Sequence, residues 1–268
     1  MLTRRALLAI VMMALPVASA MHAQEIRVAA AADLKFAMQD VAARFEKQTG
    51  TKVDVTYGSS GNFFSQFQNG APFDLFFSAD IDYPRKLEAA GLAEPGTLYE
   101  YAIGRIAIWT PADAKVDVAN LGWKTLLDSS VQRIAIANPE HAPYGRAAVA
   151  ALQKAGIYQQ VKPKLVYGEN ISQAAQFVQS GNAQAGIVAM SLAVSPGMKD
   201  GKRWEIPAGM HSPIEQAAIV LKSAANIEAA RTFLEFVKSQ AGRATLAKYG
   251  FTFSAAPSTT PPAGPQKK

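Results

Sequence analysis

The stretch IRVAAAADLKFAMQDVAARFEKQTG, residues 26–50, decides the fold because it contains a strand, a turn and a helix in succession. Residues 26–30 form a short and mainly apolar run, which is typical of a buried strand. Gly50 follows the last part of the stretch, and glycine is common just past a helix end. Between residues 34 and 47, apolar side chains recur with the spacing of one helix face, at Leu34, Met38, Val41, Ala42 and Phe45. The stretch therefore predicts a β-strand followed by an α-helix.

The alternation of strand and helix recurs along the rest of the chain. It predicts an α/β fold in which mostly parallel sheets are flanked by helices. No repeat of fixed period accompanies it, which argues against a solenoid. Further strands are predicted at 52–57, 74–77, 103–109, 133–137, 164–167, 185–189 and 217–221. Further helices are predicted at 62–69, 83–90, 145–155, 171–179, 226–239 and 241–249.

The length of the chain favours two lobes. Roughly 245 residues remain after an N-terminal signal is removed, which is near the upper limit for one hydrophobic core. The last strand and two helices are too short for a domain of their own, so we expect them to return to the first lobe. The first lobe is thus predicted at 24–102 plus 215–253 and the second at 103–214, with crossings near 101–104 and 212–216. Two lobes joined in this way enclose a cleft.

The two ends of the chain differ from the part between them. Arg4 and Arg5 precede a short apolar run at 7–15, and small residues follow it, which predicts a cleavable export signal at 1–23 and a periplasmic protein. The apolar run is well short of the ~20 residues that a membrane-spanning helix needs. Residues 254–268 are rich in Pro, Ser and Ala without an apolar period, so they are predicted to form a disordered tail.

The composition excludes several classes of protein. Hydrophobic residues make up 49% of the chain and charged residues 18%, which argues against both a disordered protein and a membrane bundle. Without cysteine the chain has neither disulfides nor thiolate metal ligands. Two of the 27 basic residues lie in 1–23, so the formal net charge falls from +6 to +4 in the mature chain. The basic residues are scattered, so we expect no nucleic-acid partner, whereas a mild positive potential favours capture of a small anion.

Four predicted helix starts that follow strand ends are candidates for a binding site. Free backbone N–H groups and the helix dipole make such starts attractive to negative charge. Open α/β sheets bind their ligands at the carboxyl ends of the strands, which is where these turns fall. The alternative is that polar side chains simply cap their own helices, namely Asp33, Ser60, Asn170 and Ser172. The four starts are Ala32-Asp33, Ser59-Ser60-Gly61, Pro143-Tyr144-Gly145 and Glu169-Asn170-Ile171-Ser172.

Catalytic and metal-binding patterns are weak. The two histidines of the mature chain, His141 and His211, lack the spacing of metal ligands. The sequence has no nucleophile elbow, no Walker loop and no dinucleotide fingerprint. We therefore predict neither an enzyme nor a bound cofactor. A cleft hydrolase stays the remoter alternative, with Ser60 as nucleophile and His141 as base, and it requires these side chains to come within about 3 Å of each other.

Six motifs occur in order between residues 26 and 253, namely AAAADLK (29–35), GSSGN (58–62), GAPFDLFFSAD (70–80), ANPEHAPYG (137–145), GENISQ (168–173) and KYGFT (248–252). Together they resemble the molybdate-binding proteins of bacterial ABC transporters. The resemblance implies a two-lobed periplasmic binding protein fold of type II that closes on a tetrahedral oxyanion in the interlobe cleft. It implies a monomer that delivers molybdate or tungstate to an ABC transporter permease in the inner membrane. Molybdenum would be bound only as its oxyanion.

The resemblance also implies which residues hold the ligand. In that family, hydroxyls and backbone N–H groups at helix starts bind the oxyanion without counter-charges. A tyrosine from the strand that here contains Ala189 sometimes adds a hydroxyl, so this chain lacks that donor. Carried over by position, the ligand-binding residues are Ala32, Asp33, Ser60, Tyr144 and, through its N–H, Ile171.

Asp33 departs from the family pattern, because that position usually carries Ser or Asn. Both of those can donate a hydrogen bond, whereas an ionised carboxylate only accepts. Beside a dianion at about 4 Å, a carboxylate costs several kcal/mol at an effective dielectric near 20. Either Asp33 turns away as a helix cap, or the ligand is a protonated oxyanion or another small solute that carries a donor. The chain alone also leaves open whether the protein feeds a permease or signals to a receptor.

Overall fold

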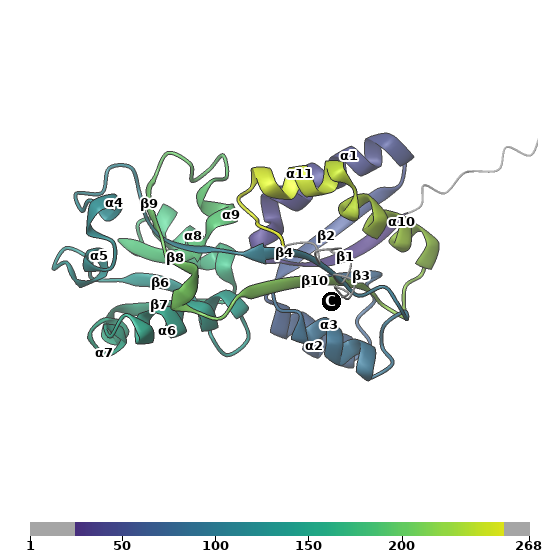
Figure 1. The fold of residues 1–268 in the computed structure, drawn as a ribbon, viewed down its shortest axis with the longest axis horizontal. Helices are drawn as coiled ribbons and strands as arrows, with labels where there is room; N and C mark the ends of the chain where they lie inside the picture. The colour runs from purple at the N-terminus through teal and green to yellow at the C-terminus, as the bar shows by residue number, and fades with distance from the viewer. Residues whose placement is uncertain (1–24, 255–268) are drawn as a thin grey trace, which may run out of the picture.

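The computed structural model describes residues 25–254, which form two lobes side by side (Figure 1). Each lobe is built around a five-stranded sheet flanked by helices, and the α/β fold class predicted from the sequence is confirmed. The predicted signal at 1–23 and all of the predicted tail except Ser254 lie outside the described residues. None of the helices in the described part is both long and apolar enough to cross a membrane.

The first lobe contains β1 (Glu25–Ala31), β2 (Lys52–Gly58), β3 (Leu75–Ser78), β4 (Tyr99–Gly104) and β10 (Ile214–Val220). Their order in the first sheet is β2-β1-β3-β10-β4. β1 pairs in parallel with β2 and β3, whereas β10 pairs antiparallel with β3 and β4. The first sheet therefore combines strands from two separate segments of the chain.

Helices cover both faces of the first sheet. A 3₁₀ turn, η1 (Ala32–Leu34), leads from β1 into α1 (Lys35–Thr49). α1 lies on one face with α10 (Ile227–Lys238) and α11 (Gln240–Lys248), and the other face carries α2 (Ser60–Gln68) and α3 (Asp82–Ala89) (Figure 1). The rings of Phe45 and Phe233 meet edge to face, with centroids 5.0 Å apart, in the core between α1 and α10. On the opposite face, Phe63 packs against Phe76.

The second lobe contains β5 (Ile106–Thr110), β6 (Ile134–Ala137), β7 (Leu165–Gly168), β8 (Ala185–Ala189) and β9 (Lys202–Glu205), in the order β7-β6-β8-β5-β9. β6 is parallel to β7 and β8, and β5 is antiparallel to β8 and β9. Both sheets are thus mixed, and the antiparallel pairs involve the strands next to the crossings between lobes. The helices are α4 (Val118–Leu121), α5 (Lys124–Leu127), α6 (Pro143–Lys154), α7 (Tyr158–Val161), α8 (Ile171–Gln179) and α9 (Met190–Ala193), with 3₁₀ turns η2 (Lys162–Lys164) and η3 (Ala208–Met210).

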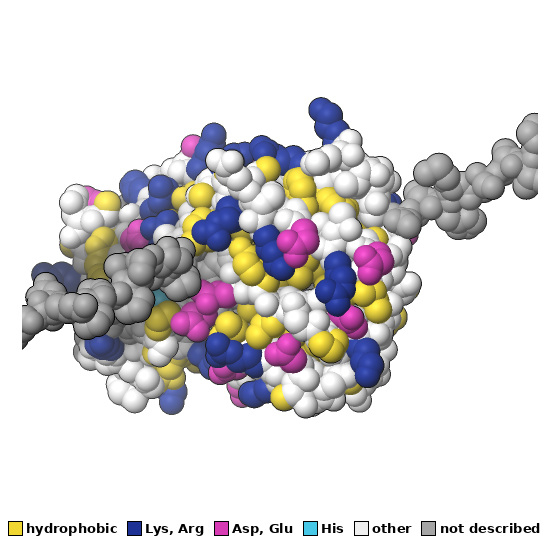
Figure 2. Space-filling view, turned by 45° about the vertical axis from the view of Figure 1, so that its right-hand side comes forward, with side chains coloured by type: hydrophobic (Ala, Val, Ile, Leu, Met, Phe, Trp, Pro, Cys, Tyr) yellow, Lys and Arg dark blue, Asp and Glu magenta, His cyan; other side chains and the backbone are white. Residues whose placement is uncertain are grey.

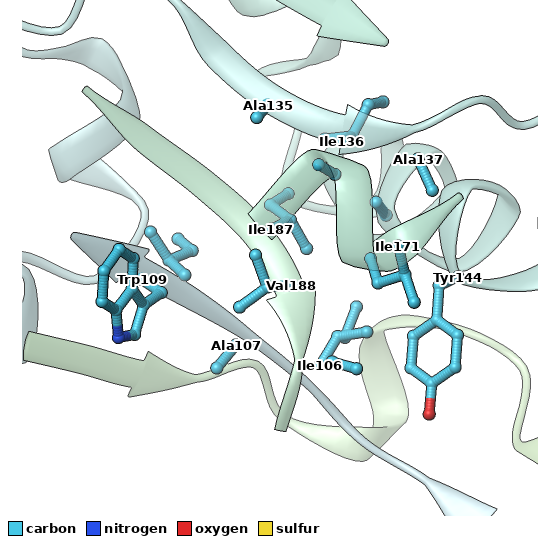
Figure 3. Packing of buried hydrophobic residues seen from close by; sticks show 14 of the residues in the cluster. Ile106, Ala107, Trp109, Ala135, Ile136, Ala137, Tyr144, Ile171, Ile187 and Val188 are labelled. Carbon is cyan, nitrogen blue, oxygen red and sulfur yellow. The ribbon is translucent and has the colours of Figure 1, made fainter. Parts of the chain in front are cut away.

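Buried aliphatic side chains hold the second lobe together. Ile106, Ile136 and Ile187 are fully buried between the sheet and its helices (Figure 3). Full burial of such a side chain contributes about 1.5–3 kcal/mol. Tyr144 and Ile171 lie at the edge of this cluster, and the Tyr144 hydroxyl points away from the aliphatic side chains. The core therefore fixes the first turns of α6 and α8.

The crossings between the sheets differ in detail from the sequence prediction. The strand predicted at 103–109 is two strands in different sheets, β4 and β5, with only Arg105 between them. Gly104 and Arg105 interrupt the apolar residues of this stretch, but a single charged residue does not by itself show that the chain changes sheet. Arg105 binds Glu205 at 2.9 Å and thereby ties the crossing to the end of β9. The sequence also missed β9, which is a largely exposed edge strand without an apolar run. The lobe boundaries at 102/103 and 214/215 stay a prediction.

Charged side chains of both signs are mixed on the surface. On the face shown in Figure 2, lysine and arginine side chains are interspersed with aspartate and glutamate rather than gathered in one patch.

Candidate functional site

The four predicted helix starts converge on one pocket between the lobes. Its empty volume is about 200 Å³, and its lining includes all five residues predicted to bind the ligand. Each start follows the carboxyl end of a strand, β1 and β2 in the first lobe and β6 and β7 in the second. Parallel strands place these ends at one edge of each sheet, and the two edges face each other. The pocket is lined by Ala31, Ala32, Asp33, Gly58, Ser59, Ser60, Ala79, Ala142, Pro143, Tyr144, Asn170 and Ile171.

Two helices begin slightly earlier than predicted, and this places two candidate residues in first turns. α2 begins at Ser60 rather than residue 62, and α6 begins at Pro143 rather than residue 145. Ser60 and Tyr144 therefore lie in the first turns of α2 and α6, and Ile171 is the first residue of α8, as predicted. N–H groups in the first turn have no intrahelical acceptor, so they are available to an anion.

The Ser60 side chain is fixed as a donor. Its Oγ accepts a hydrogen bond of 2.9 Å from the Ala79 N–H, and the residue is fully buried. A hydroxyl that accepts one hydrogen bond keeps its own proton for donation. Ser60 can therefore donate that proton to a ligand in the pocket.

Capping explains only one of the four polar side chains at these helix starts. Asn170 caps α8 by accepting a hydrogen bond of 3.0 Å from the Gln173 N–H. Ser172 instead donates to the Ala32 carbonyl of the other lobe at 2.8 Å. The Asp33 carboxylate instead accepts a hydrogen bond from Tyr144 of the other lobe at 2.9 Å, and its turning away from the ligand stays a prediction.

Asp33 is the acceptor at the centre of a buried hydrogen-bond network. Its Oδ2 accepts from the Tyr144 hydroxyl at 2.9 Å and from the Gln216 amide at 2.8 Å. The Gln216 Oε1 in turn accepts from the Tyr101 hydroxyl at 2.6 Å. Tyr101 belongs to β4 and Gln216 to β10, the two first-lobe strands next to the crossings. The network thus connects the pocket to both crossings.

Burial governs the ionisation of this network. Desolvation raises the pKa of the Asp33 carboxyl to about 6, against the lowering effect of the hydrogen bonds from Gln216 and Tyr144. The N–H groups of Asp33 and Leu34 also lower this pKa, although Oδ1 has no hydrogen bond of good geometry. Burial, and then the nearby Asp33 carboxylate, raise the pKa of Tyr144 well above its usual value. Tyr144 is therefore a neutral donor, and its hydroxyl is engaged with Asp33.

The lobes touch directly around the pocket. Ser191 of α9 donates to the Asp33 carbonyl at 2.7 Å. The Gly61 N–H donates to the His141 carbonyl at 3.0 Å, and Arg146 forms an ion pair with Asp80 across the cleft. The described conformation is therefore a closed one.

The hydrolase arrangement is not formed. His141 Nδ1 lies 3.0 Å from Ser59 Oγ, whereas the Ser60 Oγ is bonded to the Ala79 N–H. Glu169 is 3.7 Å from the other ring nitrogen of His141. Within residues 25–254 no group of three or more His, Cys, Asp or Glu side chains is placed to hold a metal ion.

Two members of the hydrogen-bond network around Asp33 were not predicted from the sequence. Gln216 and Tyr101 were placed near the crossings but not at the site, because nothing in a linear pattern shows that β10 and β4 bring them to the end of β1. Ser191 was missed for the same reason. Ala189 is fully buried at the end of β8 and offers no side-chain donor.

Two α/β lobes with a small pocket of helix starts between them define a binding protein of the periplasmic type. The profile of the bacterial extracellular solute-binding proteins matches residues 26–252, and the chain belongs to this family. It is therefore a solute-binding protein, as its relatives are, and not an enzyme.

Several of the similar proteins are named for molybdate binding. The molybdate-binding protein ModA of Rhodobacter capsulatus is 39% identical over 245 residues, covering 91% of this chain and 93% of that protein. ModA of Escherichia coli is 34% identical over 85% of this chain and 89% of that protein. The solved structure of the periplasmic molybdate-binding protein of Azotobacter vinelandii superposes with a TM-score of 0.81 at 33% identity, covering 86% of this chain and all of that one.

Proposed function

We propose that this protein binds molybdate or tungstate in the pocket between its lobes and delivers the anion to an ABC transporter permease. The observation that carries the proposal is the convergence of four helix starts on one small pocket. The pocket is small and most of the residues that line it have small side chains, which suits a small oxyanion better than a large ligand. Relatives named for molybdate binding support the choice of anion.

Each candidate residue has a chemical role in this proposal. The Ser60 hydroxyl and the N–H groups of Tyr144 and Ile171 donate hydrogen bonds to the anion. Ala32 and Asp33 add the start of η1, and both residues line the same pocket. Donors without a formal charge suit a small anion, because fixed N–H dipoles stabilise it in a buried place.

We propose export by the signal at 1–23, a periplasmic monomer without cofactor or nucleic-acid partner, and lobes at 24–102 plus 215–253 and at 103–214 that hinge about the two crossings. A permease gene and an ATPase gene beside this one would distinguish transport from sensing.

Isothermal titration of the purified protein with molybdate, tungstate and sulfate tests the function. Ser60→Ala is expected to weaken molybdate binding by about 10–100-fold, because a hydrogen bond to a charged group contributes about 1.5–3 kcal/mol. Ser65→Ala is the matched control, because Ser65 is an exposed serine of the same helix. Absence of molybdate and tungstate binding by the unaltered protein would refute the proposal.

A second candidate ligand is an oxyanion that carries its own proton, such as hydrogen phosphate. The buried Asp33 carboxylate favours it, because an acceptor in the pocket pairs with a donor on the ligand. The same titration with phosphate decides between the two. Tight phosphate binding together with absent molybdate binding would favour this second candidate.

A further inference from the structure

Asp33 is the one carboxylate among the residues that line the pocket. It is 1% exposed, its Oδ2 is held by Tyr144 and Gln216, and its Oδ1 is buried without a hydrogen-bond partner. A buried carboxylate oxygen without a hydrogen bond of good geometry can accept one from a bound ligand. A ligand in the pocket would lie beside this carboxylate.

The groups that face Asp33 provide no positive charge. Tyr144 of α6 and Tyr101 of β4 are the titratable groups close to it, and both favour their neutral forms. β10 contributes the neutral Gln216, and α9 contributes Ser191, which binds the Asp33 backbone. Among the described residues, no lysine, arginine or histidine forms an ion pair with this carboxylate.

A dianion and an ionised carboxylate cannot share this pocket without strong repulsion. Neither has a donor for the other, and burial leaves little water to screen them. One proton between an Asp33 oxygen and an anion oxygen removes one negative charge and converts the repulsion into a charge-assisted hydrogen bond. The network on Oδ2 keeps the carboxyl group in place for this contact.

We propose that Asp33 is the specificity-determining residue of the pocket and that it binds an oxyanion dianion through a shared proton, so that one proton is taken up with each anion. This inference rests on the proposed function of the pocket. Protonated Asp33 supplies the side-chain donor that Ser or Asn would supply at this position. Affinity for the anion is therefore coupled to pH.

The ionisation of the free protein agrees with this coupling. Burial already brings the pKa of Asp33 to about 6, so the carboxyl group is mainly ionised above that pH. A dianion beside it raises the pKa further. The proton that enters on binding at about pH 8 then comes from solvent.

The test is isothermal titration of the purified protein with sodium molybdate at about pH 8 in two buffers of different ionisation enthalpy. The difference in measured heat counts the protons, and we expect about one per anion bound. A pH series adds a second readout, in which the Kd rises about tenfold per pH unit above the pKa of free Asp33.

Asp33→Asn imitates the protonated carboxyl group and should bind molybdate with about zero proton uptake and a flat pH series. Asp40→Asn is the control, because Asp40 pairs with Lys248 on the surface of the first lobe and should leave the proton count unchanged. The measurement on the unaltered protein needs no variant, so it decides the question even if Asp33→Asn does not fold.

The possible results of the titration distinguish this inference from the proposed function on which it rests. Tight binding of molybdate by the unaltered protein without proton uptake would overturn the shared proton and leave the proposed function intact. Binding of neither molybdate nor tungstate by the unaltered protein or Asp33→Asn at any pH would overturn both. Hydrogen phosphate, which brings its own proton, should bind with less than one proton taken up if it binds.

Discussion

Two aspartates of the first lobe are equally buried, with 1% exposed, yet they lie at opposite ends of the sheet and have opposite surroundings. Asp74 directly precedes β3, and both of its oxygens are hydrogen-bonded, from the Arg27 N–H and the Ala225 N–H, each at 2.7 Å. The Arg27 guanidinium is 3.8 Å away. Asp33 follows β1 and has one oxygen bonded and one unpaired.

The comparison shows that the two ends of the strands have different roles in this fold, one in stability and the other in binding. At the amino end of the strands, a buried carboxylate is fully used by the chain itself and joins β1 to the segment before α10. At the carboxyl end, strands turn into helices and leave donors and one acceptor without partners inside the protein. Asp74 is therefore expected to stabilise the fold. Ionised Asp33 is expected to lower the stability of the fold, because it is placed for the binding pocket.

Removing the structural carboxylate should have the largest effect. Asp74→Ala removes the acceptor of the part-buried Arg27 and Ala225 N–H groups, and each such group left unsatisfied costs about 1–3 kcal/mol. We expect the free energy of unfolding to fall by about 2–4 kcal/mol in urea titrations, because two hydrogen bonds to a buried carboxylate are lost together. The molybdate affinity of the folded fraction should not change. A loss below about 1 kcal/mol would show that Asp74 does not differ from Asp33 in this way.

Neutralising Asp33 should have the opposite sign. Its folded pKa of about 6 lies above its ordinary value of 3.8, so the folded state binds more protons than the unfolded state between about pH 4 and 6. Ionisation of Asp33 thus removes stability as the pH rises through that window, by an amount on the order of 3 kcal/mol. Asp33→Asn should be more stable than the unaltered protein by up to that amount at about pH 8.

Urea titrations of both proteins across this range check the prediction. The advantage of Asp33→Asn should shrink as the pH falls towards 4, because the unaltered protein then carries a neutral carboxyl group as well. The other carboxylates titrate alike in the two chains and cancel in the comparison. A variant that is less stable than the unaltered protein at about pH 8 would contradict the view that the carboxylate is poorly paired.

The network on Asp33 also depends on a glycine at the crossing. A Cβ at Gly104 would lie 2.3 Å from the Tyr144 hydroxyl oxygen and 2.6 Å from Gln216 Nε2, so both partners of Asp33 would have to move. Gly104→Ala should lower stability by about 1–3 kcal/mol, the usual range for overpacking, and weaken molybdate binding. Gly209→Ala is the control, because its Cβ would meet nothing within 4 Å. Equal melting temperatures for the two variants would contradict this account.

Local patterns were enough to predict most of the fold. The bounds of α8 and β8 agree with the prediction at both ends, because apolar spacing and flanking turns agree there. The break at Arg105 was missed, because one charged residue within an apolar stretch is compatible with a single strand as well as with a change of sheet. The charged edge strand β9 was missed because its side chains are mostly exposed and give no apolar pattern.

The candidate site was predicted in part. Helix starts are visible in sequence, so Ser60, Tyr144 and Ile171 can be grouped from local patterns alone. The surroundings of Asp33 cannot, because Tyr144, Gln216 and Tyr101 meet only when three elements distant in sequence pack together. The raised pKa of Asp33 is caused by burial, and no local sequence pattern shows that this residue is buried.

The smallest effect is expected at the rim of the cleft, where the contrast between paired and unpaired carboxylates matters least. Asp80 pairs with Arg146 across the lobes, and both side chains are partly exposed, at 24% and 41%. Exposed pairs contribute about 0–1 kcal/mol, so Asp80→Asn should weaken molybdate binding by about fivefold at most. Asp82→Asn, which removes a pair with Arg85 inside α3, should not change it. Titrations at low and high salt check this prediction. The affinities of Asp80→Asn and the unaltered protein should differ at low salt and agree at high salt, because salt screens an exposed pair. A larger effect that persists in salt would mean that Asp80 holds the closed form as Asp74 holds the sheet.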